Sequence, residues 1–285
     1  MCFLCDAKAS NLFTPLLTRR AVVLGAAAAA ALPATAQVDV GNSSSLRNLV
    51  PAEQLESSAN QQYAQMMAEA RTKGALAPDN FAQLVRLRAI ASRLIPIAPR
   101  WNDRARQWKW EVNLIGSKQI NAFCMPGGKI AFYTAILDQL KLSDDEAAMV
   151  MGHEMAHALR EHARSRIAKT QATGMGLSIG ARLLGLGDLG NAAANIGTQL
   201  ISLKFSRQDE TEADLVGLEL AARAGYQPAA SVSLWKKMAA ASGGSGSGGT
   251  ALSFLGTHPN SPERIAQLQA NVPKVQGLYE QARRG

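Results

Sequence analysis

Two histidines and a glutamate within five residues carry side chains that could bind a metal ion and activate water. His153, Glu154 and His157 follow the pattern His-Glu-x-x-His. On a helix, the two histidines would share one face and could bind one ion, while the glutamate could reach a water molecule on it. Short patterns of this kind also occur in helices whose charged face is simply solvated. The pattern by itself therefore leaves two interpretations, a metal-dependent hydrolase and an ordinary surface helix.

The residues around this pattern favour the hydrolase because they predict a well-defined helix. Ser143 and Glu146 stand at the spacing of a capping box, and an apolar run from Ala147 to Met151 follows them. We expect the helix to extend to about Ile167. A further histidine, His162, comes nine residues after the first one, which would place it on the opposite side of such a helix. We therefore interpret His162 as a surface histidine.

A catalytic zinc ion needs a third protein ligand and one open position for water. Metzincins, one class of zinc peptidases, would supply that ligand as a histidine at position 163 and would have glycine at position 160. This chain has Ala163 and Arg160 there, so the metzincin class is excluded. With no suitable histidine nearby, we expect a carboxylate from another segment.

An acidic segment about fifty residues downstream offers this carboxylate. It opens an apolar-periodic stretch that predicts a second helix ending at Gly225. Glu210 and Asp214 are four residues apart and share a face of this helix, whereas Glu212 points elsewhere. Glu210 as third ligand and Asp214 as acceptor for the N–H group of a ligand histidine would complete the site. The alternative is an acidic helix start that only interacts with the helix dipole.

Four short motifs occur in the order Asn-Ala-Phe-Cys-Met-Pro-Gly-Gly, His-Glu-Met-Ala-His, Glu-Thr-Glu-Ala-Asp and Thr-His-Pro, with Arg264 after the last. In this order the chain resembles the gluzincin family of HtpX-type and CAAX-prenyl-type zinc endopeptidases, and its soluble periplasmic members above all. The motifs span residues 121–264, about half of the chain. The resemblance implies an α+β, mainly helical fold, in which a zincin-like metallopeptidase domain has a small antiparallel sheet beside the His-Glu-x-x-His helix.

The resemblance also implies roles for the matching residues. One zinc ion (Zn2+) per chain would be bound by His153, His157 and Glu210, with Glu154 as general base. Three further residues would lie beside the active site and take part in catalysis: Asp214, His258 and Arg264. Membrane-embedded relatives have several membrane spans, and this chain shows none beyond its leader, so prenyl-protein processing is not expected.

His258 is the one histidine outside the predicted metal helix, and it follows a run of glycine and serine. Pro259 restricts the backbone just before it, so the imidazole would be presented from a stiffened point. Three interpretations are open: a surface histidine in a turn, a latch on the open position of the zinc ion, or a donor to the oxyanion of the reaction, assisted by Arg264. We favour the latch because the adjacent run can supply the mobility that a reversible ligand needs.

The first 36 residues predict a cleavable export signal. A pair of arginines precedes an apolar stretch from Ala21 to Leu32, and the small-x-small site Ala34-Thr35-Ala36 follows, so the mature chain would begin near Gln37 in the periplasm. A retained membrane anchor is the alternative, but the stretch is short for a bilayer and Pro33 ends it. Both Sec and twin-arginine export are compatible with these residues.

Composition argues against a disulfide-stabilised fold and against a nucleic-acid partner. Two of the three cysteines lie in the leader, which leaves Cys124 alone, so no internal disulfide and no lipoprotein anchor are expected. The net charge of the full chain is +8, and the predicted leader carries +2 of it, so the mature chain would have +8 − 2 = +6, a modest and scattered charge. Such a charge fits loose contact with anionic membrane surfaces, whereas nucleic-acid binding would need clustered basic and aromatic residues.

The remaining segments predict one metallopeptidase domain at 51–285, preceded by a loose segment at 37–50. Helices are expected at 54–73, 80–94 and 262–282, and strands at 108–114, 121–125 and 129–134. The alternation of apolar and polar residues in 108–114 predicts a strand with one buried face. Residues 173–203 are rich in glycine and alanine, and we expect a mobile hairpin or lid there rather than a membrane span.

Asn121, Ala122 and Phe123 precede a Gly-Gly turn, and by resemblance they form a sheet edge facing the cleft, where an extended peptide could add as another strand. The alternative is an ordinary buried strand with Phe123 in the core. The expected function is that of an exported zinc endopeptidase acting on misfolded or unassembled envelope proteins, with peripheral contact to the membrane or to outer-membrane assembly machinery. An aminopeptidase and a zinc-binding, chaperone-like protein are the alternatives, and the intact Glu154 argues against the second.

Overall fold

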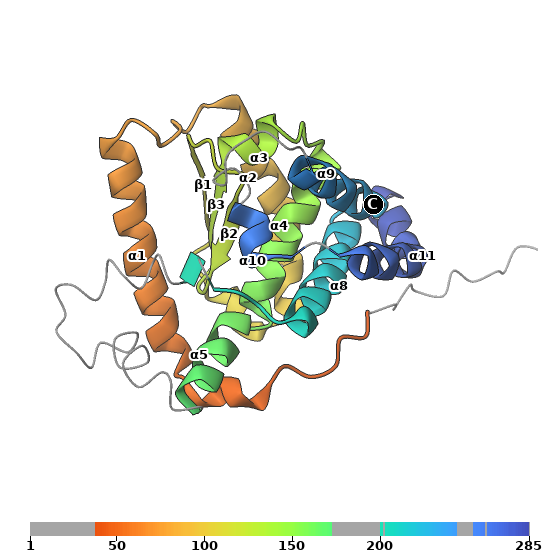
Figure 1. Cartoon of the computed structure of the whole chain (residues 1–285), viewed down its shortest axis with the longest axis horizontal. Coiled ribbons are helices and arrows are strands. Elements are labelled where there is room, and N and C mark those ends of the chain that lie inside the picture. The colour runs from red at the N-terminus through yellow and green to blue at the C-terminus, as the bar shows by residue number, and fades with distance from the viewer. Residues whose placement is uncertain (1–37, 173–199, 202, 244–252, 260, 285) are drawn as a thin grey trace, which may run out of the picture. The chain divides into compact units, whose positions relative to one another are not determined.

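The computed structural model describes residues 38–172, 200–201, 203–243, 253–259 and 261–284 (Figure 1). Helices dominate this part of the chain, and a three-stranded sheet lies among them. The fold is therefore α+β and mainly helical, as the sequence predicts. The predictions for most of 173–203 and for the glycine- and serine-rich run at 244–249 lie outside the described residues.

The sheet consists of β1 (Glu111–Ile115), β2 (Ala122–Met125) and β3 (Lys129–Tyr133), in the order β1-β3-β2. β2 and β3 form an antiparallel hairpin whose turn requires glycine, because Gly127 and Gly128 have φ angles of +85° and +79°. β1 runs parallel to β3, which makes the sheet mixed. The expected purely antiparallel sheet was wrong on this point, because β3 inserts between two strands that are neighbours in the sequence.

β1 is buried on both faces, whereas the sequence predicted one buried face. Asn113, expected to be exposed, is buried, and its amide donates to the Tyr63 hydroxyl at 3.1 Å and to the Glu111 carboxylate at 2.8 Å. The additional burial comes from tertiary packing of helices against the sheet. α1 (Ala52–Thr72) packs against β2 and β3, while α2 (Ala82–Leu94) packs against β1, both close to their predicted positions.

α4 (Asp144–Leu159) begins at the predicted capping box. The Ser143 hydroxyl accepts a hydrogen bond from the Glu146 amide, and the Glu146 carboxylate accepts one from the Ser143 amide. The helix lies between the sheet and α8 (Arg207–Arg223) and packs against both (Figure 1). Nearly every side chain along it is therefore buried. A second capping box, between Ser206 and Asp209, starts α8.

Two glycines allow α4 and α8 to approach each other closely. A Cβ atom on Gly152 would lie 2.8 Å from the Gly217 carbonyl oxygen, and one on Gly217 would lie 2.7 Å from the His153 amide nitrogen. Both distances are too short for any side chain, and the atoms in the way belong to the backbone. Because both positions lack a side chain, α4 and α8 can come together at His153.

α4 ends at Leu159, so the predicted extension to Ile167 was wrong. Arg160 is the C-cap, and Glu161 has a φ angle of +57°, a conformation that residues other than glycine rarely adopt. A separate helix, α5 (His162–Ala172), starts directly afterwards. Because of this break, side chains after Leu159 point in other directions relative to the His-Glu-x-x-His face than they would on one continuous helix.

The remaining helices complete the described part of the fold. α11 (Pro262–Arg284), which covers the predicted C-terminal helix, packs against α8 and α9 (Ala230–Gly243). The shorter elements are α3 (Thr134–Asp138), α10 (Ser253–Thr257) and the 3-10 helices η1 (Ser45–Leu49), η2 (Ile95–Arg100) and η3 (Asp103–Arg106). Among the described residues, no helix combines the length and the apolar character that crossing a membrane would require.

The N-terminal segment at 38–50 is bound to the domain, in contrast to the loose segment that its composition predicts. Val38 is buried, and its amide donates to the fully buried carboxylate of Glu219 at 2.5 Å. Arg160 donates to the carbonyl oxygen of Gly41 at 3.0 Å. Two buried charged side chains, Glu219 of α8 and Arg160 at the C-cap of α4, thus hold the backbone of this segment, an interaction that composition does not reveal.

Candidate metal centre

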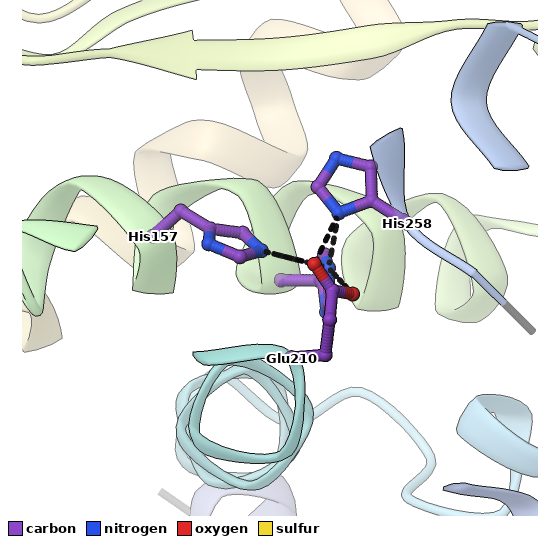
Figure 2. Close-up of side chains that lie close together, drawn as sticks. His157, Glu210 and His258 are labelled. Atoms are coloured by element: carbon purple, nitrogen blue, oxygen red, sulfur yellow. Dashed lines mark hydrogen bonds and ion pairs between the residues drawn. The ribbon is translucent and has the colours of Figure 1, made fainter. Parts of the chain in front are cut away.

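Four buried side chains from three segments point toward one another. His153 and His157 lie one turn apart on α4, Glu210 lies in the first turn of α8, and His258 directly follows α10. Figure 2 shows Glu210 between the rings of His157 and His258. Each of the four residues is at most 4% exposed, and their ligand atoms all lie within 4.8 Å of one another.

The spacing of the donor atoms fits a tetrahedral zinc ion. Zinc bonds of about 2.0–2.1 Å would hold neighbouring ligand atoms about 3.3 Å apart. The Nε2 atoms of His153 and His157 are 3.1 Å apart, and each is 3.5 Å from a carboxylate oxygen of Glu210. His258 Nδ1 is 3.2 Å from His153 Nε2 and 3.0 Å from Glu210 Oε1. One carboxylate and three imidazoles can therefore surround one ion.

The electrostatics of the cluster also suit a cation. Burial disfavours a charged His153, but the carboxylates of Asp214 and Glu210 outweigh it and raise the pKa of His153 to about 9. Burial lowers the pKa of His157 well below its usual value, so this imidazole is neutral, the form that binds metal. Burial alone would raise the pKa of Glu210, yet the neighbouring histidines lower it, and the carboxylate stays ionised.

Asp214 and Arg264 form an ion pair behind His153. Asp214 Oδ1 lies 3.0 Å from His153 Nδ1, and Arg264 donates to both oxygens of Asp214 at 2.7 and 2.8 Å. Arg264 also lies 2.9 Å from Glu210 and stacks 3.8 Å above the Trp235 ring. Burial opposes the ionised form of Asp214, but Arg264 and His153 lower its pKa overall. The pair thus fixes the orientation of His153 and supports Glu210.

Glu154 lies beside the cluster and is buried as well. Its Oε1 atom is 3.5 Å from His258 Nε2 and has no hydrogen-bond partner among the described residues. Burial raises the pKa of Glu154, although His258 and His153 oppose this effect. A carboxylate with a raised pKa and an open oxygen beside the cluster is suited to accept a proton and to return it.

His162 belongs to this centre, so its interpretation as a surface histidine was wrong. It is 3% exposed, and its Nδ1 atom lies 2.9 Å from His157 Nδ1. Its Nε2 atom lies 3.3 Å from Glu212, whose carboxylate also accepts from Arg160 at 2.9 Å. The misinterpretation followed from treating 144–167 as one helix, because the break at Glu161 turns His162 toward His157.

A mostly apolar pocket adjoins the cluster and encloses about 690 Å³ of space, part of it open to solvent. Glu154, His157 and His258 line this pocket, and so do Ala122 and Phe123 of β2. Asn121 is buried next to β2 without lining the pocket, and its carbonyl accepts from the Tyr133 amide at 3.0 Å. The structure thus brings two of the three residues of the predicted peptide-binding segment to the pocket.

The sequence did not indicate two aromatic contacts of the ligand histidines. Phe205 stacks on His157 with ring centres 4.0 Å apart, and Trp235 contacts His153 edge to face at 5.9 Å. Phe205 directly precedes the N-cap of α8. The predicted start of that helix was therefore the one sequence signal that could have pointed to Phe205. Trp235 lies in α9, and no spacing rule connects it with His153.

A His-Glu-x-x-His helix that meets a glutamate from a second helix defines a zinc metallopeptidase of the gluzincin type. The model of peptidase family M48 matches residues 83–272, more than half of the chain, and the chain belongs to this family. Enzymes of the family are zinc-dependent metalloendopeptidases. The buried cluster of His153, His157, Glu210 and His258 can hold one such ion.

Three relatives illustrate the similarity. The mitochondrial metalloendopeptidase OMA1 of Schizosaccharomyces pombe is 39% identical over 169 residues, which are 59% of this chain and 48% of the relative. The metalloprotease LoiP of Escherichia coli is 28% identical over 216 residues, 72% of this chain and 77% of the relative. The beta-barrel assembly-enhancing protease of the same bacterium is 31% identical over 136 residues, 44% of this chain and 27% of the relative. The chain therefore spans about half of the length of this OMA1 relative.

Proposed function

We propose that this chain is a zinc metalloendopeptidase that cuts unfolded polypeptides at internal peptide bonds. The observation that carries this proposal is the joining of three features in one place. The cluster that can hold zinc, the buried carboxylate of Glu154 and the edge strand β2 all border the same pocket.

The position of β2 supports binding of an extended peptide. β2 ends the strand order β1-β3-β2, so one of its edges has no neighbour in the described sheet. A peptide that adds to this edge would be held through its backbone, which does not depend on its sequence. A side chain of such a peptide would enter the apolar pocket, whose walls include Leu55, Trp108 and Phe205. Unfolded chains offer such extended segments, whereas folded proteins rarely do.

The chemistry is divided among the residues of the centre. When bound to His153, His157 and Glu210, zinc supplies Lewis acidity that polarises the scissile carbonyl and makes a water molecule more acidic. Glu154 takes the proton of the attacking water at its open Oε1 atom and delivers it to the leaving amine. Asp214 and Arg264 act as positioning residues, because both contact ligands of the ion from behind.

The proposed setting is quality control of misfolded or unassembled proteins in the bacterial envelope. The support is the predicted export signal at 1–36 and the similarity to the beta-barrel assembly-enhancing protease, whose name connects that relative with the assembly of beta-barrels. Peripheral contact with the membrane or with assembly machinery is part of this proposal. Fractionation of cells that produce the full chain would test it, and recovery in the cytoplasm with an uncleaved leader would contradict it.

Digestion of one protein in two states tests the activity. We expect the zinc-loaded chain to cut a reduced and alkylated protein at many internal sites and to leave the same protein intact when it is folded. Mass spectrometry of the products distinguishes internal cuts from trimming at a terminus, which would indicate an aminopeptidase. Glu154→Gln is the control, and we expect it to bind zinc without turnover. Equal suppression of aggregation by both proteins, with no cleavage by either, would indicate a chaperone-like function.

We further propose that His258 acts as a latch on the zinc ion. Its Nδ1 atom stands at the spacing of a fourth ligand from His153 and Glu210, which supports the latch. Arg264 donates to Asp214 and to the Pro259 carbonyl, so it is not available to assist at an oxyanion. If His258 is a latch, the substitution His258→Ala raises peptidase activity. If His258 is an oxyanion donor, the same substitution lowers kcat by about 10²-fold or more. Unchanged kinetics would reject both roles.

A further inference from the structure

The two ligand histidines on α4 have different partners at their outer nitrogen atoms. A metal-binding histidine usually donates its second N–H group to a carboxylate, a carbonyl or a water molecule. His153 follows this rule with Asp214. The partner of His157 is instead another imidazole, that of His162, at a distance of 2.9 Å between the two Nδ1 atoms.

The direction of this hydrogen bond follows from the positions of the nitrogen atoms. His157 Nε2 faces the cluster, 3.1 Å from His153 Nε2 and 3.5 Å from Glu210, so its lone pair must point at the ion. The proton of neutral His157 therefore sits on Nδ1 and is donated to His162 Nδ1. His162 must then carry its own proton on Nε2, where Glu212 lies 3.3 Å away as acceptor.

Glu212 is in turn held as an acceptor. Its Oε2 atom accepts from Arg160 Nε at 2.9 Å and lies 2.8 Å from Arg160 Nη2. Arg160 also donates to the Gly41 carbonyl, which ties it to the N-terminal segment. A carboxylate bound by a guanidinium group has no proton to donate, so the whole chain of hydrogen bonds can run only from His157 outward.

We infer that His162 is a positioning residue for His157: it accepts the His157 Nδ1 proton, passes the hydrogen bond to Glu212, and so fixes the imidazole in the tautomer and orientation that bind zinc. This inference rests on the proposed role of His157 as a ligand. A residue that merely filled space at this position would need no acceptor at Nδ1. The two roles therefore differ in what a substitution does to zinc affinity.

Zinc affinity of three full-length variants, measured by competition with a chelator, tests the inference. We expect His162→Ala to weaken zinc binding by about 10- to 100-fold, the usual effect of losing such a partner. His162→Asn places a side-chain oxygen near the position of Nδ1 and should restore affinity to within a few-fold of the wild type. Arg166→Ala, on an exposed position of the same helix, is the matched control and should bind zinc normally. Affinity of His162→Ala within about threefold of the wild type, or equal weakening in both His162 variants, would overturn the inference.

A measurement on the unaltered protein covers the case in which His162→Ala does not fold. Nitrogen NMR of the zinc-loaded chain with labelled histidines reports which ring nitrogen carries a proton. We expect His157 to be protonated on Nδ1 and His162 on Nε2 only, and a proton on His162 Nδ1 would refute the inference. These outcomes are separate from the proposed function. A wild-type chain that binds zinc but cuts no peptide would refute the peptidase activity and leave the role of His162 intact.

Discussion

The two sides of the metal centre hold equivalent ligands by different means. Behind His153 stands a single ion pair, Asp214 with Arg264, contributed by α8 and α11. Behind His157 stands a longer chain, which passes through His162 to Glu212. The first side depends on two opposite charges that neutralise each other in a buried place. The second side also ends in a buried ion pair, Glu212 with Arg160, but this pair reaches His157 only through His162 and depends on a helix break. We therefore expect substitution of His162 to act mainly on zinc affinity.

The largest effect is expected where the two sides meet, at Glu210, which lies 3.5 Å from the Nε2 atom of each ligand histidine. Glu210→Ala removes the carboxylate that neutralises the ion, so we expect protein washed with chelator to retain no stoichiometric zinc and to have no peptidase activity. Metal analysis after dialysis is the measurement. Thr211→Ala, at the adjacent and partly exposed position, is the control and should keep its zinc. Full zinc content in Glu210→Ala would show that the third ligand is another residue.

Next in size is the loss of the ion pair on the His153 side. Asp214→Ala leaves the buried Arg264 with Glu210 as its remaining carboxylate, and breaking a buried pair costs about 3–5 kcal/mol in the free energy of unfolding. Zinc affinity should fall as well, by about 10- to 100-fold. Asp214→Asn keeps an oxygen for His153 and should be milder in both respects. Chemical denaturation of the metal-free proteins checks the first expectation. A metal-free Asp214→Ala protein as stable as the wild type would remove the contrast with His162.

A smaller effect is expected at the helix crossing that positions the His153 side. In Gly217→Ala, the new methyl group would lie 2.7 Å from the His153 amide nitrogen, and only a shift of the two helices can relieve the clash. Overpacking of this kind typically costs about 1–3 kcal/mol. Thermal unfolding measures it. Gly256→Ala is the matched control, because a Cβ atom there meets nothing within 4 Å. If both variants unfold at the wild-type temperature, the close approach does not constrain the site.

Some features of the two sides of the metal centre could be predicted from the sequence, and others could not. Periodicity and capping boxes are local, so α1, α2, α4 and α8 and the shared face of Glu210 and Asp214 could be predicted. The helix break could not be predicted, because no glycine or proline marks Glu161, a residue type that rarely adopts the positive φ angle found there. The position of His162 depends on that break, so it could not be predicted either.

Non-local pairing was the second source of error. β1 and β2 follow each other in the chain, yet β3 lies between them, and nothing in the composition of three short strands specifies that order. The burial of Asn113 and the docking of Val38 on Glu219 have the same origin. Each depends on a partner far away in the sequence, which a single chain without its relatives does not identify.

The smallest expected quantity is the coupling between the two sides. Asp214 and His162 share no hydrogen-bond partner among the described residues, since one contacts His153 and Arg264 and the other contacts His157 and Glu212. In a double-mutant cycle of Asp214→Asn and His162→Ala, we therefore expect the losses in zinc-binding free energy to add within about 0.5 kcal/mol. Chelator competition on the four proteins gives the coupling energy directly. A coupling well above this value would mean that the ion or the α4 backbone transmits a change from one histidine to the other. The centre would then be one cooperative unit, and its two sides would not be independent.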